Sequence, residues 1–193
     1  FISFLAALFS KENSITLIAV VPVLMLMFFP KSKVSYFSLF APFIIATVIF
    51  LLVRTSILGF DFGGASDELM NNPFIKFVGG QWVDFTFAEK FATIIYTMGR
   101  YILLLLFPHP LTNDYYPRHI AIMNITDWQV IFSMLGYFIL IALAIKFFKK
   151  QKLISFGILF FLITISIVSN IIFPVGTNMS ERFLFMPSVG FSI

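Results

Sequence analysis

The stretch Val130-Ile-Phe-Ser-Met-Leu-Gly-Tyr-Phe-Ile-Leu-Ile-Ala-Leu-Ala-Ile-Lys-Phe-Phe148 is apolar apart from a few small polar groups and one lysine near its end. Lys149-Lys150-Gln151-Lys152 follows, and a second apolar run occupies residues 153–173. The hydrocarbon core of a bilayer is about 30 Å thick and needs about 20 apolar residues in a helix. The two runs therefore predict a pair of membrane-spanning helices joined by a lysine-rich turn.

The composition of the whole chain agrees with this interpretation. Hydrophobic residues make up 60% of the 193 residues and charged residues 11%, against roughly 25% charged residues in an average soluble protein. A soluble domain of this size has too much surface for its volume to bury so many apolar side chains. The predicted fold class is all-α, a polytopic transmembrane helical bundle.

The other apolar runs add further spans to this bundle, each bounded by a charge, a proline or an end of the chain. Residues 1–193 are expected to form the C-terminal part of one membrane domain of a longer protein. The expected spans are residues 1–9 (partial), 15–29, 34–53, 130–148, 153–173 and 183–193 (partial).

Lysines in two short turns predict which side of the membrane each span faces. Lys31 and Lys33 lie in one turn, and the other turn is 146–152; basic residues in short loops stay in the cytoplasm. Residues 54–129 then form one long loop that begins and ends on the outer side. Its apolar stretch 91–107, with Arg100 in the middle, is predicted to be a re-entrant or interfacial helix. A membrane helix that pairs with residues 54–89 is the alternative.

Composition also excludes several kinds of site. The chain has no cysteine, which rules out disulfides, thiolate metal sites and cysteine nucleophiles, and its two histidines make a zinc centre improbable. The 13 basic residues form no stripe interleaved with aromatics, so no nucleic-acid partner is expected. The cofactor prediction stays open between none and a divalent cation, for which Asp114 is a candidate ligand.

Charged residues on the outer side are the candidates for chemistry, and each has a plainer alternative. Lys11-Glu12 forms either an ion pair at the rim of a membrane cavity or a solvated turn in which Ser10 caps the next helix. Glu181-Arg182 is either an arginine oriented by its neighbour to neutralise a lipid-linked phosphate or a local salt bridge. The polar loop after residue 107 is either a binding loop or a proline-rigid interfacial one, and its candidates are His109, Asp114 and Arg118.

Three blocks of sequence resemble the membrane part of the transmembrane-and-tetratricopeptide-repeat O-mannosyltransferases and their bacterial relatives, a branch of the GT-C glycosyltransferases. They are Leu8-Phe-Ser-Lys-Glu-Asn-Ser-Ile-Thr-Leu17, Gly99-Arg-Tyr-Ile-Leu-Leu-Leu-Leu-Phe-Pro-His-Pro-Leu-Thr-Asn-Asp-Tyr115 and Ser169-Asn-Ile-Ile-Phe-Pro-Val-Gly-Thr-Asn-Met-Ser-Glu-Arg-Phe-Leu-Phe-Met-Pro-Ser-Val-Gly-Phe191. The last is the most specific. The spans between the blocks are similar only in hydrophobicity.

The resemblance implies a GT-C-like bundle that takes a sugar from a polyprenyl-phosphate donor to a protein hydroxyl or a glycan acceptor on the non-cytoplasmic side. It also implies tetratricopeptide repeats downstream, and a principal catalytic acid upstream of Phe1, so the catalytic residue itself is unknown. The polar residues of the blocks would line the donor and acceptor cavity, and the complete set of candidates is Lys11, Glu12, Arg100, His109, Asp114, Arg118, Glu181 and Arg182.

The function expected from the sequence is therefore a multi-pass membrane glycosyltransferase, with mannose as the favoured sugar and membrane lipids around it. A non-catalytic membrane scaffold or a lipid-linked-sugar transporter with the same fold is the alternative. Richness in Phe, Ile, Lys and Asn favours an AT-rich bacterial genome, and hence the bacterial cytoplasmic membrane over the endoplasmic reticulum.

Overall fold

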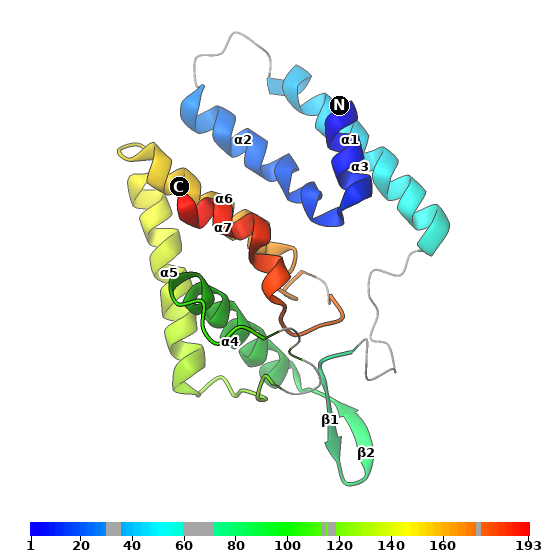
Figure 1. The fold of residues 1–193 in the computed structure, drawn as a ribbon, viewed down its shortest axis with the longest axis vertical. Coiled ribbons are helices and arrows are strands. Elements are labelled where there is room, and N and C mark those ends of the chain that lie inside the picture. Colours follow the sequence, from blue (N-terminus) through cyan, green and yellow to red (C-terminus); the bar gives the residue numbers. More distant parts are fainter. Residues whose placement is uncertain (30–35, 60–71, 113–114, 116–118, 173–174) are drawn as a thin grey trace.

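The computed structural model describes residues 1–29, 36–59, 72–112, 115, 119–172 and 175–193, and most of them are helical (Figure 1). One antiparallel hairpin, with strands β1 (Ile75–Val78) and β2 (Gln81–Asp84), accompanies the helices. In chain order the helices are α1 (Ile2–Ser10), the 3-10 helix η1 (Glu12–Thr16), α2 (Leu17–Phe28), α3 (Tyr36–Leu58), α4 (Phe87–Leu106), α5 (Trp128–Phe147), α6 (Lys152–Ser166), the 3-10 helix η2 (Glu181–Leu184) and α7 (Phe185–Ser192).

Among the residues that the structure describes, two helices are long and apolar enough to cross a membrane, over Phe37–Ile57 in α3 and Trp128–Phe147 in α5. Only 17% and 11% of their apolar windows are buried inside the molecule, so most of their apolar side chains face outward. A helix in the core of a soluble protein would show the opposite distribution. Shorter apolar helices cover Glu12–Phe28 and Lys152–Ser166. These features indicate association with a membrane.

The helix α6 is shorter than the expected span 153–173, because it ends at Ser166. Polar side chains take over the backbone groups there: the Ser169 hydroxyl donates to the carbonyl of Ser166 at 2.6 Å. Asn170 has a φ of +61°, and its side-chain oxygen accepts from the amide of Val175 at 2.8 Å. A left-handed asparagine with local side-chain bonds is a typical way to end a helix.

The helices α4 and α5 lie side by side and run in the same direction. Ala92 and Val130 pack together near their N-terminal ends, and farther along the Tyr137 hydroxyl donates to the carbonyl of Met98 at 3.1 Å. Figure 1 shows both helices starting at the end from which the hairpin projects, while the α5–α6 turn lies at the opposite end. Parallel neighbours need a connection that returns along their length.

That return is made by the segment between α4 and α5. The backbone amide of Met123 donates to the Thr93 hydroxyl at 3.1 Å, which brings the segment back to the first half of α4. Thr93 and Met123 are both buried, and Ile120 joins the main core beside α4. The segment that follows α4 thus runs back beside this helix before α5 begins.

The hairpin corrects the expectation of an all-α fold. Val78-Gly79-Gly80-Gln81 forms its turn, with φ of +60° at Gly79 and +90° at Gly80. Positive φ at both central residues is what a two-residue hairpin turn requires, and glycine adopts it without strain. The rings of Phe77 and Trp82 face each other across the strands with centroids 5.1 Å apart.

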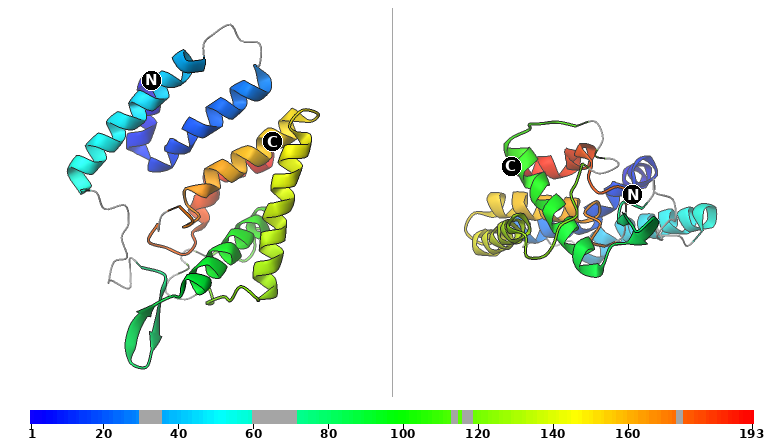
Figure 2. Two further views of the ribbon diagram at one scale, coloured as in Figure 1. Left: turned by 180° about the vertical axis from the view of Figure 1, so that it is seen from behind. Right: turned by 90° about the horizontal axis from the view of Figure 1, so that it is seen from below.

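The main core is shared by α4, α6 and η2, and α1, α2 and α3 pack in separate clusters (Figure 2). Helix α1 packs against α3, and α2 against α6. The backbones of α6 and α7 approach each other closely at two glycines. A Cβ atom on Gly157 would lie 2.7 Å from the Gly190 carbonyl oxygen, and one on Gly190 would lie 2.6 Å from the Gly157 oxygen. Only glycine permits this crossing.

Candidate functional site

The carboxylate of Glu181 joins two segments that are far apart in the sequence. Its Oε1 accepts a hydrogen bond from the backbone amide of Thr112 at 2.6 Å and from the Tyr115 hydroxyl at 3.1 Å. Thr112 and Tyr115 belong to the loop after α4, whereas Glu181 begins η2. Hydrogen bonds to an ionised acceptor are stronger than neutral ones. This interaction holds the second and third resembling blocks together.

Tyr101 fixes the same two segments from the α4 side. Its hydroxyl accepts a hydrogen bond from the backbone amide of Ser180 at 3.0 Å, and its side chain is 1% exposed. A buried phenol with its oxygen satisfied anchors both an apolar ring and a polar tip. Ser180 is the N-cap residue of η2. Tyr101 therefore fixes the start of η2, where Glu181 is the first residue.

The Tyr115 phenol stays protonated at neutral pH. Burial raises the pKa of Tyr115 above its usual value, and the hydrogen bond to Glu181 and the charge of that carboxylate raise it further. The positive charge of Arg100 acts in the opposite direction. The phenol is therefore a fixed donor to Glu181, within the electrostatic range of Arg100.

Arg100 lies on α4 and is half-buried. Its Nε atom is buried and makes no hydrogen bond among the residues that the structure describes. The residue lines a cavity of about 460 Å³ between α4 and α5. The predicted role of Arg100 in the donor and acceptor cavity stays a prediction, although the residue does line a cavity.

Glu181 and Arg182 do not act as a pair in this structure. Glu181 binds Thr112 and Tyr115, while Arg182 is exposed and its guanidinium lies 5.5 Å from the centroid of the Phe183 ring. The local salt bridge that formed the plainer alternative is not seen. The Arg182 side chain is therefore exposed, and the carboxylate next to it in the sequence already accepts hydrogen bonds from Thr112 and Tyr115.

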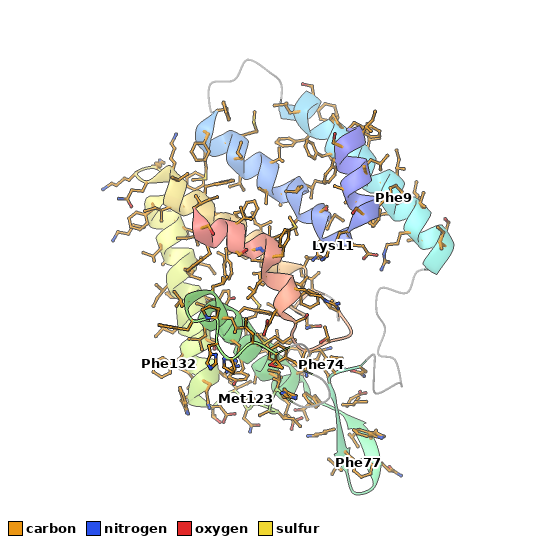
Figure 3. The ribbon with its side chains drawn as sticks, in the orientation of Figure 1. Phe9, Lys11, Phe74, Phe77, Met123 and Phe132 are labelled. Atoms are coloured by element: carbon orange, nitrogen blue, oxygen red, sulfur yellow. The ribbon has the colours of Figure 1, made fainter. Side chains whose placement is uncertain are left out.

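The Lys11-Glu12 turn forms an ion pair with a different helix. Glu12 Oε1 lies 3.2 Å from Arg54 Nε on α3, and Lys11 is exposed at the end of α1 (Figure 3). Ser10 does not cap the next helix, because Lys11 is the N-cap residue of η1 and makes no capping bond. The Glu12 side chain is 59% exposed, so solvent weakens this pair.

The loop after residue 107 contains the remaining candidates. His109 is exposed and precedes a cis peptide bond to Pro110, and its backbone amide donates to the carbonyl of Phe107 at 2.7 Å. Asp114 and Arg118 lie outside the described residues. In the described part of the chain no three His, Asp or Glu side chains gather in a way that could hold a metal ion. The divalent cation stays a prediction.

Sequence reasoning missed the residues that organise this site. Thr112 contributes a backbone amide, which no side-chain pattern reveals. Tyr101 and Tyr115 lie in the second resembling block, but tyrosines near a membrane interface are expected as belt residues. The hydrogen bond from Tyr115 to Glu181, 66 residues away, is what distinguishes Tyr115 from such a belt residue.

The comparisons with known proteins agree with the resemblance in part of the chain. The chain is 34% identical over 77 residues to the human protein named Protein O-mannosyl-transferase TMTC4. The match covers 37% of this chain and 10% of that protein, so the chain spans about a tenth of the length of the relative. No family model matches the chain, and no solved structure matches it. This partial likeness is consistent with a glycosyltransferase at the level of the family.

Proposed function

We propose that this protein is a membrane glycosyltransferase of the GT-C type, which moves a sugar, with mannose favoured, from a polyprenyl-phosphate donor to a protein hydroxyl on the non-cytoplasmic side. The partial relative, an O-mannosyl-transferase by name, supports the class of reaction. The observation that carries the proposal within this chain is the Glu181 carboxylate bound by Thr112 and Tyr115, because it unites two of the three resembling blocks at one place.

The arrangement of the helices supports an outer position for this site. The lysine-rich α5–α6 turn lies at the end of α5 that is away from the hairpin (Figure 1), and basic turns face the cytoplasm. Helix α4 starts at the hairpin end, and the segment after it returns beside it. In the proposed topology α4 is a re-entrant helix and the loop that binds Glu181 faces outward, where a lipid carrier would present its sugar.

In the proposed reaction the acceptor hydroxyl attacks the anomeric carbon of the sugar as the bond between that carbon and the phosphate oxygen breaks. The electron pair of the breaking bond stays on the lipid phosphate, and the hydroxyl proton passes to a carboxylate, which the resemblance places upstream of Phe1. The departing phosphate gains negative charge. A preorganised cation stabilises such charge, and the exposed guanidinium of Arg182 is suited to this role.

The first experiment compares sugar transfer from a radiolabelled polyprenyl-phosphate sugar in membranes that contain the protein at its full length. Arg182→Ala is expected to reduce transfer by about tenfold or more, because a charge-assisted contact contributes about 1.5–3 kcal/mol. Arg182→Lys should recover part of the rate. Lys90→Ala is the matched control, since its ammonium lies 5.0 Å from the Phe74 ring centroid in a comparable cation–π contact.

Three results would count against this proposal. Loss of transfer together with an equal loss of folded, inserted Arg182→Ala protein would make Arg182 structural. Equal loss in Lys90→Ala would remove any special role for Arg182. Absence of transfer with mannose, glucose and other common donors would favour a scaffold or a lipid-linked-sugar transporter instead, and the same labelled lipid in a flipping assay would separate those two.

A further inference from the structure

The cavity between α4 and α5 combines an apolar wall with a few polar groups. Its volume is about 460 Å³, and Leu103, Phe132 and Gly136 supply part of its apolar lining. Gly136 leaves room on the α5 side, because a Cβ atom built there would meet nothing within 4 Å. Phe132 is 65% exposed and projects from α5 beside the cavity (Figure 3). The cavity therefore adjoins the apolar outer face of a predicted membrane span.

Arg100 is the charged residue that lines this cavity. Its Nε atom is buried and lacks a hydrogen-bond partner within the described ranges, and the two ion pairs found there use Arg54 and Lys76 instead. A guanidinium in apolar surroundings is costly unless an anion accepts its hydrogen bonds. The charge of the site thus calls for a negatively charged group.

Trp128 gives the expected depth of the cavity in a membrane. Trp128, Gln129 and Ser133 line it from the first turns of α5. Ser133 lies five positions after Trp128, or about 7.5 Å along a helix. Tryptophans at the ends of spans mark the level of the headgroups. A phosphate bound by Arg100 would lie just below that level, with its acyl chains directed into the bilayer.

We propose that this cavity binds a membrane glycerophospholipid with an anionic headgroup. The phosphate accepts hydrogen bonds from Arg100, and one acyl chain follows Leu103 and Phe132 past Gly136. A free phosphate ion would leave the apolar lining without a partner. Thr112, Tyr115 and Glu181 do not line the cavity, so the inference does not depend on the proposed sugar transfer.

The test measures the lipid that remains bound to purified protein, by mass spectrometry under native conditions with phosphatidylglycerol and phosphatidylcholine offered together in mixed micelles. Wild-type protein is expected to retain phosphatidylglycerol. Arg100→Gln should weaken retention by about tenfold to a hundredfold, as the loss of a charge-assisted hydrogen bond predicts. Gly136→Leu should also weaken retention, because its side chain fills the cavity while Arg100 stays in place.

Arg54→Gln is the matched control, since it makes the same change in net charge outside the cavity, and it should retain the lipid. The proposal is overturned if Arg54→Gln and Arg100→Gln lose phosphatidylglycerol equally, or if neither Arg100→Gln nor Gly136→Leu loses it. It also fails if inorganic phosphate displaces phosphatidylglycerol as well as a lipid does, which would indicate a site for soluble anions. Preferential displacement by polyprenyl phosphate would assign the cavity to the donor lipid.

Discussion

Gly99 on α4 lies directly against Ser133 on α5. A Cβ atom there would lie 2.7 Å from Ser133 Cβ and would also collide with the Ser133 hydroxyl oxygen. Gly99→Ala is therefore expected to lower the free energy of unfolding by about 1–3 kcal/mol, as overpacking usually does, although alanine favours the helix itself. The measurement is the unfolding midpoint in detergent.

A pair of controls separates this collision from other effects of the substitution. Ser133→Gly in the Gly99→Ala background removes the colliding atoms and should restore part of the stability. Gly136→Ala places a methyl group on α5 where nothing lies within 4 Å, so it should not destabilise the protein. A Gly99→Ala variant as stable as the wild type would mean that the two helices can separate at no cost.

At the scale of elements, the start of α4 is coupled to the hairpin through Glu89. Glu89 forms a capping box with Thr86, and Lys76 on β1 donates to its carboxylate. The hydrogen bond from Lys76 is the main cause that lowers the pKa of Glu89, followed by the bond from the Thr86 amide. Since the folded pKa lies below the usual value, the stabilisation is complete above about pH 4.5 and is lost as the pH falls through the folded pKa.

Acidification is thus expected to loosen the hairpin from α4. Trp82 reports this through its fluorescence when the other tryptophan is removed by Trp128→Phe, because Trp82 lies on β2. In that background Glu89→Gln should lack the acid transition and resemble the acidified protein at neutral pH. An unchanged transition in Glu89→Gln would assign it to another group.

Hydrophobic runs in the sequence predict much of the helical framework. They predict the ends of the helices less well. The expected runs 34–53 and 130–148 correspond to α3 and α5, because long apolar stretches have few alternatives. The hairpin was missed, although Val78-Gly79-Gly80-Gln81 between β-forming residues is a recognisable signal. The early end of α6 depends on bonds from Ser169 and Asn170, which hydropathy does not register. The Glu181 site depends on the backbone amide of Thr112 and on a contact with Tyr115, which is far away in the sequence. Neither can be found from local sequence patterns.

At the scale of the whole molecule, the expected topology is tested with a matched pair of glutamines. Gln81 is exposed at the hairpin turn, at the bottom of Figure 1, and Gln151 is exposed in the lysine-rich turn between α5 and α6, at the upper left. The chain has no cysteine, so each Gln→Cys variant carries a single thiol. In intact cells or sealed vesicles, Gln81→Cys should react with an impermeant reagent on the outer side, and Gln151→Cys only after permeabilisation. The reverse pattern would invert the topology.

The contact of Gly157 with Gly190 limits how α6 and α7 can move relative to each other. Where two backbones touch without intervening side chains, neither helix can rotate about its axis without a backbone clash. Helices α6 and α7 should therefore move together as one rigid unit. Relative motion of helices is easier at contacts filled by flexible side chains, such as the contact between α2 and α6, where Met27 packs close to Phe156.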